Sequence, residues 1–266
     1  MGGATALAAS YPLFIERYAF QVNTYRIPVP HLPPNFIGFT LAQLADLHYG
    51  FLMPLGMAQK IVHKINALPK DLVVCTGDYI HARKESTLID TIWPTLATLQ
   101  APAGVCSILG NHDHWGSTER SLYWLEKSGQ SVRHTARAIV KGAERIWIGG
   151  SGDLWEDELG IDEAFQYAPP EECKILLTHN PDSADTDFET RVDLMIAGHT
   201  HGGQVILPFV GPPVLPVRNK AYSSGFIRTG KTRLYISRGL GWGMLPVRFN
   251  CFPEISVLTL TREETP

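Results

Sequence analysis

Residues 41–48 read LAQLADLH, an apolar stretch that ends in an aspartate, Asp46, and a histidine, His48. In an extended backbone residues i and i+2 point to the same side, so these two side chains would face one ligand while Leu47 points into the core. Four later apolar stretches also end in a cluster of metal-ligating residue types. Those clusters are TGD at 76–78, GNHD at 110–113, THN at 178–180 and GHTH at 198–201. Because ligands of open α/β sheets bind beyond the carboxyl ends of the strands, the five clusters are predicted to meet at one rim.

Amphipathic stretches separate the first apolar runs. Residues 55–68, 86–99 and 117–127 have helical spacing, and Ser117 is placed to cap the third helix. Strands are predicted at 39–45, 71–76, 104–109, 145–150, 174–178 and 194–197, and after His201 at 203–207, 222–228, 233–237 and 255–260. The pattern predicts one layered α/β domain over residues 38–266, with residues 1–37 as an N-terminal segment that packs on the domain or leads into it.

Composition and charge exclude several classes of protein. The chain has 266 residues, 44% of them hydrophobic, and a net charge of −3, so no nucleic-acid binding is expected, because nucleic-acid binders are usually basic. No apolar run approaches the roughly 20 residues of a membrane-spanning helix, and residues 1–10 do not have the pattern of a signal peptide. We expect a protein that is cytoplasmic or peripheral at the membrane, with residues 1–10 either the remnant of an upstream anchor or a frayed end. The four dispersed cysteines are predicted to be buried free thiols.

Seven side chains in the clusters are candidate metal ligands. They are Asp46, His48, Asp78, Asn111, His179, His199 and His201. Oxygen and imidazole ligands without a thiolate suit Mn²⁺, Fe²⁺, Zn²⁺ or Co²⁺, and we favour Mn²⁺. A single catalytic ion usually takes about three protein ligands, so seven fit two divalent metal ions if one carboxylate bridges them. Two ions about 3.5–4 Å apart can polarise a phosphoryl group and stabilise both the attacking and the leaving oxygen.

His112 is left over beside Asn111 and is the candidate catalytic group that protonates the leaving oxygen. Asp113 follows it and is predicted to orient or support that ring. Each motif alone is more often structural, and it is the occurrence of all five in one order that favours a metal site. The histidines at 31, 63, 81 and 134 lie outside the clusters and are predicted to be surface or packing residues, while His114 stays open.

The motifs D-x-H, G-D, G-N-H-D, a lone histidine and G-H-T-H, in this order, resemble the calcineurin-like metallophosphoesterase family over about residues 38–260. The resemblance implies a four-layer α/β/β/α sandwich with a dinuclear metal centre at its rim. Asp46, His48 and His201 would hold one metal and Asn111, His179 and His199 the other. It also implies that Asp78 bridges both metals and that His112 serves as general acid or leaving-group stabiliser.

Three further stretches resemble a bacterial branch of membrane-associated phosphodiesterases, some of which hydrolyse UDP-2,3-diacylglucosamine. These stretches are GHTHGGQV at 198–205, YISRGLG at 235–241 and GDLW at 152–155. Members of that branch often carry an N-terminal anchor or export signal. The chain departs from them there, because only residues 1–10 precede the YPLFIE segment at 11–16.

Three stretches near the motifs are unusually apolar, namely residues 51–55, residues 207–215, and Trp242, Met244, Leu245 and Phe249. If exposed together, they would form a patch of the kind that marks a lipid, membrane or partner site. The alternative is that they pack on one another as a lid over the core. Basic residues lie among them, of which Arg238 is the candidate substrate-binding residue, since arginine suits bidentate phosphate contacts.

We therefore predict a dinuclear metal-dependent phosphodiesterase in which a metal-bound hydroxide attacks phosphorus and His112 protonates the leaving alkoxide. Its substrate would be an amphiphilic phosphoester, including a UDP-linked lipid, with peripheral membrane contact. Two other functions stay open. One is a phosphomonoesterase or nucleotidase, because ester preference depends on loop shape; the other is a non-catalytic metal-binding interaction module, against which the intact ligand set argues.

Overall fold

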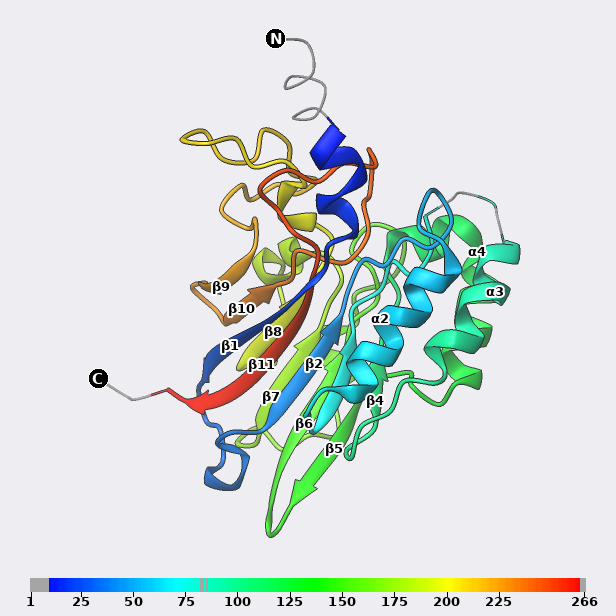
Figure 1. The fold of residues 1–266 in the computed structure, drawn as a ribbon. Helices are drawn as coiled ribbons and strands as arrows, with labels where there is room; N and C mark the ends of the chain where they lie inside the picture. Colours follow the sequence, from blue (N-terminus) through cyan, green and yellow to red (C-terminus); the bar gives the residue numbers. More distant parts are fainter. Residues whose placement is uncertain (1–9, 82–83, 85, 264–266) are drawn as a thin grey trace.

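Two β-sheets form the centre of the molecule in the computed structural model, which describes residues 10–81, 84 and 86–263 (Figure 1). The first sheet has the order β1 (Gln21–Val29), β11 (Glu254–Arg262), β2 (Thr40–Leu44), β3 (Leu72–Cys75) and β4 (Val105–Ser107). The second has the order β5 (Thr135–Lys141), β6 (Glu144–Gly150), β7 (Cys173–Leu177), β8 (Leu194–Ala197), β10 (Arg233–Ile236) and β9 (Gly225–Arg228).

Most neighbouring strands beside the motifs are parallel. Strands β2, β3 and β4 are parallel in the first sheet, and β6, β7, β8 and β10 are parallel in the second. All five sequence clusters follow one of these parallel strands. The carboxyl ends of parallel neighbours lie at the same edge of a sheet, so the topology brings the clusters of each sheet together.

The core between the sheets is built by alternation along the strands. Leu72 and Val74 of β3 face the second sheet, and Ile148, Ile175 and Ile196 of that sheet belong to the same buried cluster. The intervening residues of β3 point to the opposite face. They pack there against the helices α2 (Leu55–Ala67), α3 (Ser86–Leu96) and α4 (Asn111–Lys127).

The outer face of the second sheet carries a thinner cover, formed by the one-turn helix α5 (Ile161–Ala164) and the 3₁₀ helix η3 (Pro181–Asp185). The predicted α/β/β/α order of layers is therefore confirmed, with a much slighter fourth layer than first layer. Two further 3₁₀ turns, η1 (Glu16–Tyr18) and η2 (Pro34–Phe36), flank β1.

Several local predictions differ from the structure. Strands β1 and β5 were not expected, and β1 lies at the edge of its sheet, where a proline such as Pro28 is tolerated. Residues 203–207 form no strand: the 3₁₀ turn η4 (His201–Gly203) and two isolated bridges, from Val205 to Phe249 and from Leu207 to Gly211, take its place. The reason is that two glycines in left-handed conformations, Gly202 and Gly203, turn the chain back on itself.

Helix α4 begins at Asn111 rather than at the predicted Ser117. The Ser117 backbone is extended (φ −175°, ψ 111°) and breaks the helix into two parts. Its Oγ accepts a hydrogen bond from the Arg120 backbone N–H (3.3 Å), so Ser117 caps the second part as predicted. The first part carries the G-N-H-D cluster.

The described part of the N-terminal segment contacts loops at the upper end of the sheets in Figure 1. Arg17 donates to the Pro246 carbonyl (2.8 Å) and the Tyr18 hydroxyl donates to the Leu52 carbonyl (2.9 Å). All four cysteines are buried and free. Among the described residues, no helix has the length and apolar character needed to cross a bilayer.

Candidate metal centre

Each candidate ligand lies just beyond a strand end. Asp46 and His48 follow β2, Asp78 follows β3, and Asn111 follows β4 as the first residue of α4. His179 follows β7. The pair His199 and His201 follows β8.

The first group of ligands consists of Asp46, His48 and His201, whose ligand atoms all lie within 4.8 Å of one another. The Nε2 atoms of His48 and His201 are 3.0 Å apart, and His201 Nε2 is 3.9 Å from Asp46 Oδ1. All three side chains are buried. The two imidazole nitrogens are thus close enough to bind the same ion.

The second group consists of Asp78, His179 and His199, with Asn111 beside them. His179 Nε2 lies 3.1 Å from His199 Nδ1, 3.1 Å from Asn111 Oδ1 and 3.3 Å from Asp78 Oδ2. One carboxylate joins this group to the first, because Asp78 Oδ2 is also 3.3 Å from His48 Nε2.

The donor chemistry of the second group fits a cation. His179 Nδ1 lies 2.8 Å from the Thr76 carbonyl and His199 Nε2 lies 3.0 Å from the Pro216 carbonyl. A carbonyl only accepts, so each neutral ring carries its hydrogen on that nitrogen. The lone pairs of His179 Nε2 and His199 Nδ1 therefore face each other, beside oxygens of Asn111 and Asp78. Converging lone pairs need a positive charge between them, which a divalent metal ion supplies.

A buried oxygen of Asp46 in the first group also indicates a bound cation. Asp46 Oδ1 accepts the His199 backbone N–H (2.8 Å), but among the described residues the buried Oδ2 has no hydrogen-bond partner. A buried carboxylate oxygen without a donor is unfavourable unless a cation binds it. The residues present thus fit two metal ions with Asp78 between them.

The pKa shifts of the second group also show that this part of the site favours a positive charge. Burial, the largest single effect, would lower the pKa of His179, but the charge of Asp78 and its hydrogen bond, together with the charges of Asp46 and Asp153, raise that pKa to about 10. Burial would raise the pKa of Asp78, yet the charges of His179 and His112 hold it well below its usual value. Burial and the charge of His179 lower the pKa of His199 to about 3. His199 therefore stays neutral, which is the form that binds a metal.

Backbone conformation at the ligands departs from the sequence-based expectation. Asp46, His48, Asp78, His199 and His201 all have left-handed φ angles, between 49° and 70°. The extended-backbone interpretation of the D-x-H and H-T-H pairs is therefore wrong, since β2 and β8 end before these residues. Such conformations are unfavourable by about 1–2 kcal/mol for residues other than glycine, and they concentrate at functional sites.

Because of these left-handed turns, the last two ligands in the sequence, His199 and His201, do not share one group. His199 belongs to the second group and His201 to the first. The idea that both histidines grip one ion is not what the structure shows. The division matches the assignment that the family resemblance implied.

Two glycines allow the loops to approach closely. A Cβ atom on Gly110 would lie 2.4 Å from Asp78 Oδ1 and 2.7 Å from the His179 ring. A Cβ atom on Gly198 would lie 2.5 Å from Asp46 Oδ2. Contacts shorter than 3 Å cannot be relieved without moving a candidate ligand, so the glycines before Asn111 and His199 are needed for the geometry of the site.

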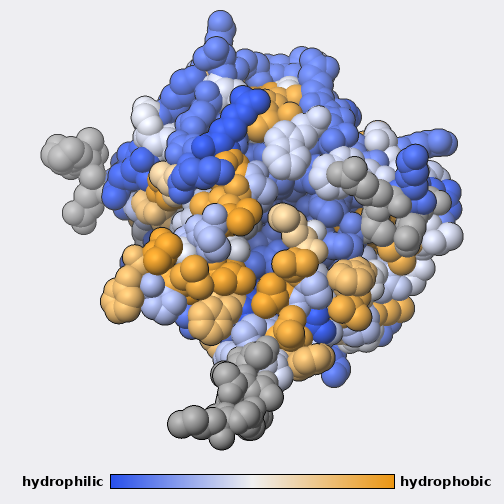
Figure 2. Space-filling model, turned by 90° about the horizontal axis from the view of Figure 1, so that it is seen from above, coloured by the Kyte–Doolittle hydropathy of each residue, from blue (hydrophilic) through white to orange (hydrophobic). Residues whose placement is uncertain are grey.

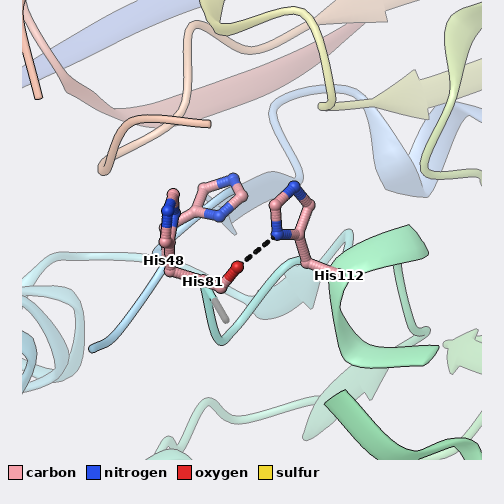
Figure 3. A group of neighbouring side chains, drawn as sticks. All are labelled: His48, His81 and His112. Atoms are coloured by element: carbon pink, nitrogen blue, oxygen red, sulfur yellow. Dashed lines mark hydrogen bonds between the residues drawn. The ribbon is translucent and has the colours of Figure 1, made fainter. Parts of the chain in front are cut away.

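His112 stands beside both groups with one ring nitrogen engaged. Its Nδ1 donates to the His81 carbonyl (2.6 Å), as Figure 3 shows, and its backbone N–H donates to Asp78 Oδ1 (2.8 Å). The ring is nearly perpendicular to that of His48, with centroids 4.5 Å apart. Because Nδ1 is occupied, Nε2 is the nitrogen left to hold or deliver a proton in the cavity that His112 lines.

His81 is a site residue that the sequence analysis missed. Its ring stacks on Phe51 (centroids 5.3 Å apart) and lines the cavity. His48, His81 and His112 also offer ligand atoms within 4.8 Å of one another (Figure 3). The contact with Phe51 agrees with the predicted packing role of His81, whereas its place in the cavity lining was not predicted. The available signal was its place in the short loop after Asp78.

Asp113 holds the loops rather than the His112 ring. Its buried carboxylate accepts the backbone N–H groups of Asp78 (2.8 Å), Tyr79 (2.9 Å) and Gly110 (2.9 Å). The contact that orients the His112 ring comes instead from the carbonyl of His81. Asp113 thus ties the loop after β3 to the start of α4.

Two arginines near the site are engaged by other groups of the protein. Arg238 pairs with the buried carboxylate of Glu254 (2.7 Å) and is not among the described residues that line the cavity. Arg248 is fully buried and donates to the carbonyls of Gly241 (2.6 Å) and His201 (3.3 Å). Arg248 therefore organises the loop after β10.

A cavity of about 720 Å³ opens above the two ligand groups. Part of its lining is aliphatic, from Val205, Val214, Met244, Leu245 and Val247, and part is aromatic, from Trp115 and Trp155.

Exposed apolar side chains lie on segments that line this cavity or contact its lining, and Figure 2 shows apolar side chains gathered around a hollow. The most exposed are Phe209, Val210, Met244, Phe14 and Leu245. The apolar loops are thus exposed and do not form a closed lid, although Trp242, which was expected among them, is buried. We call Phe14, Ile15, Phe51, Leu52, Phe209, Val210, Val214, Met244 and Leu245 the apolar rim.

Comparisons with known proteins agree with this geometry. Residues 39–203 match the family model of calcineurin-like phosphoesterases. The chain is 33% identical to an uncharacterised metallophosphoesterase, YkuE, of Bacillus subtilis over 94% of this chain and 88% of that protein. It is 31% identical to the phosphodiesterase YaeI of Escherichia coli over 97% and 94% of the two chains. The UDP-2,3-diacylglucosamine pyrophosphatase LpxG of Chlamydia muridarum is 25% identical over 85% and 86%.

Metallophosphoesterases typically bind divalent metals, and the His/Asp groups after β2, β3, β7 and β8 are of the type that holds them. A family model that spans residues 39–203 covers all five clusters. The chain therefore belongs to the calcineurin-like phosphoesterase family and is a metallophosphoesterase.

Proposed function

We propose that this metallophosphoesterase is a phosphodiesterase that uses two divalent metal ions, Mn²⁺ being favoured, on amphiphilic substrates. The observation that carries the proposal is the place of Asp78 Oδ2, 3.3 Å from a histidine of each ligand group. Asp46, His48 and His201 would hold one ion, and Asn111, His179 and His199 the other. When bound, the ions would polarise the phosphoryl group and activate the attacking water.

The chain's own residues supply the proton and the geometry. His112, protonated at both nitrogens, keeps its Nδ1 hydrogen on the His81 carbonyl and gives its Nε2 proton to the leaving oxygen. Asp113 fixes the position of the loop of Asp78 relative to the turn before His112, because its carboxylate accepts three backbone hydrogen bonds from them. Arg238 has no part in this scheme, because Glu254 neutralises its guanidinium.

An amphiphilic substrate is supported by the lining of the cavity and by the apolar rim. The phosphate would lie on the ligand groups, and an aliphatic part would lie along Val214, Met244 and Leu245. A relative named a pyrophosphatase of a UDP-linked lipid has a similar sequence over most of its length. Peripheral contact of the apolar rim with a membrane surface belongs to the same proposal.

The decisive experiment is metal reconstitution followed by an ester screen. Chelated protein is loaded with Mn²⁺, Fe²⁺, Zn²⁺ or Co²⁺, metal is counted per chain, and hydrolysis of bis-p-nitrophenyl phosphate is compared with that of p-nitrophenyl phosphate. We expect two ions per chain and faster hydrolysis of the diester. Faster hydrolysis of the monoester would identify a phosphomonoesterase, and two bound ions without turnover of either ester would identify an interaction module.

A further inference from the structure

Two tryptophan rings line the cavity beside the proposed catalytic groups. The Trp155 ring lies 4.5 Å from the His199 ring, nearly perpendicular to it, and the Trp115 ring lies 4.6 Å from the His112 ring. Both tryptophans belong to the cavity lining, and Trp155 is 47% exposed. Large aromatic surface kept exposed next to a phosphate site indicates a surface that binds a part of the substrate.

The two rings are held in place by one acidic loop. The Trp115 Nε1–H donates to the carboxylate of Glu156 (2.6 Å), the residue that follows Trp155. Asp153 Oδ1 accepts the backbone N–H groups of Trp155 (2.9 Å) and Glu156 (3.0 Å). Asp153 is itself 1% exposed. The aromatic surface is therefore organised before any ligand binds, which reduces the entropy lost on binding.

The aliphatic lining comes from other segments, 205–216 and 243–247. Gly243 belongs to this lining, and a Cβ atom built on it would lie 3.0 Å from His201 Nε2. Both linings contact His199, the aliphatic one through the Pro216 carbonyl (3.0 Å) and the aromatic one through Trp155. The aromatic lining also contacts His112, through Trp115. The two sides of a bound phosphodiester would thus meet surfaces of different chemistry.

We infer that Trp115 and Trp155 form a subsite for a planar ring of the nucleobase type carried by the leaving group of the phosphodiester. The inference rests on the proposed function and adds to it the substrate's ring and its orientation. Aromatic side chains stack on any base, because every base has a π face. Trp115 contacts His112, which protonates the leaving oxygen, so a ring stacked there belongs to the group that leaves.

The orientation fixes which bond breaks. The water oxygen bonds to phosphorus, the bond from phosphorus to the oxygen of the ring-bearing group breaks, and that oxygen takes the proton of His112. The aliphatic group stays on phosphorus as an alkyl phosphate. A nucleoside alkyl phosphodiester would therefore yield the nucleoside and the alkyl phosphate.

The test uses two diesters that differ only in the base. Thymidine 5′-(butyl phosphate) and the butyl phosphate of 1-O-methyl-2-deoxyribose have the same alkoxide leaving group. We expect the Mn²⁺-loaded enzyme to favour the thymidine compound by about 5- to 150-fold in kcat/KM, the factor that stacking one base supplies. The products should be thymidine and butyl phosphate. Equal rates, or thymidine monophosphate and butanol as products, would overturn the inference.

Substitutions test whether the two tryptophan rings cause the preference for the thymidine compound. In Trp155→Leu and Trp115→Leu the ratio of the two kcat/KM values should fall towards one, chiefly through KM, and Trp155→Phe should restore most of it. Tyr167→Leu is the matched control, because Tyr167 is 84% exposed and outside the described cavity lining. A preference that survives both leucine variants would contradict the inference.

A binding measurement separates this inference from the proposed function. Thymidine monophosphate should bind the Mn²⁺-loaded protein about 5- to 150-fold more tightly than deoxyribose 5-phosphate in calorimetry, and Trp155→Leu should remove the difference. Failure of bis-p-nitrophenyl phosphate hydrolysis would overturn the proposed phosphodiesterase function. Hydrolysis of that ester with no difference between the two monophosphates would overturn the aromatic subsite alone.

Discussion

At the scale of single residues, the site depends on one carboxylate that serves two groups of ligands. Asp78 Oδ2 lies at the same distance, 3.3 Å, from His48 Nε2 and His179 Nε2. Its other oxygen accepts the backbone N–H of His112. The same side chain therefore connects both candidate metal positions to the proposed proton donor.

Asp78→Ala should abolish binding of the pair of metal ions, because each ligand group loses a ligand and the shared negative charge disappears. We expect fewer than two ions per chain when metal is counted after reconstitution. Asp187→Ala, at a fully exposed carboxylate, is the control and should bind as the parent does. Retention of two ions by Asp78→Ala would contradict the bridging role.

His112→Ala should keep both ions and lose activity according to the leaving group. A general acid contributes about 10²–10⁴-fold, so that loss is expected with poorly leaving alkyl diesters. Aryl diesters with a nitrophenolate leaving group need no proton and should lose far less. Equal losses with both kinds of ester would argue against proton donation by His112.

Gly110→Ala tests the close approach of the loops. The added methyl group would overlap Asp78 Oδ1 and the His179 ring, so we expect metal affinity to fall at least about 10-fold, as it does when positioning groups of a metal site are disturbed. Gly56→Ala is the matched control, since Gly56 lies in α2 with nothing near its Cβ position. It should stabilise the fold by about 0.5–1 kcal/mol. Calorimetric titration with Mn²⁺ compares the two variants.

At the scale of elements, the sequence predicted the strands and candidate ligands that are marked by a sharp change from apolar to polar residues. Apolar runs such as residues 72–75 are buried on both faces and end abruptly in polar clusters, so strand ends and candidate ligands could be recognised together. Strand β1 could not, because its residues are mostly half-exposed and carry no clear alternation. Its pairing partner, β11, lies at the other end of the sequence.

Side-chain partners were predicted less well than ligand types. Asp113 and Arg238 have the residue types expected at a phosphoester site, but backbone amides engage the first and Glu254 the second. His81 was missed because it lies three residues beyond Asp78, outside the cluster that directly follows β3. Left-handed turns at the ligands also escaped prediction, since they result from contacts between loops that are distant in the chain.

The loop after β10 depends on the buried Arg248. Its guanidinium donates to the carbonyls of Gly239, Gly241, His201 and Cys251. Arg248→Met should destabilise the fold by about 3 kcal/mol or more, because each buried acceptor left unsatisfied costs about 1–3 kcal/mol. Denaturant unfolding with a chelator present measures the loss, and the exposed Arg262→Met is the control. A change below about 1 kcal/mol would contradict this role.

At the scale of the whole molecule, apolar and polar surfaces are arranged around one opening. Three residues of the apolar rim, Val214, Met244 and Leu245, line the cavity together with the candidate ligands Asp78, Asn111, His199 and His201. Figure 2 shows this face with its apolar side chains around the hollow. Such an arrangement suits a substrate whose phosphate enters the cavity while its chains stay in a lipid surface.

Removing apolar side chains from the apolar rim should lower activity on lipid-like diesters without lowering activity on bis-p-nitrophenyl phosphate. Phe209→Ser combined with Val210→Ser should reduce sedimentation with phosphatidylethanolamine–phosphatidylglycerol vesicles, because both side chains are exposed and apolar and neither is among the described residues of the cavity lining. Hydrolysis of lipid-like diesters should fall while that of bis-p-nitrophenyl phosphate stays near the parent rate. Tyr167→Ser serves as the control. Equal losses on both substrates would contradict a membrane-facing rim.

The order of strands in the first sheet has a consequence for biosynthesis. β11, formed by residues 254–262, lies between β1 and β2, and in Figure 1 the last strand, in red, runs beside the first, in dark blue. During translation β1 emerges early and stays without its partner β11 until residues 254–262 have been synthesised. The sheet that supports Asp46 and Asp78 is therefore completed only after all the other strands of both sheets have been made, because β11 follows them in the chain.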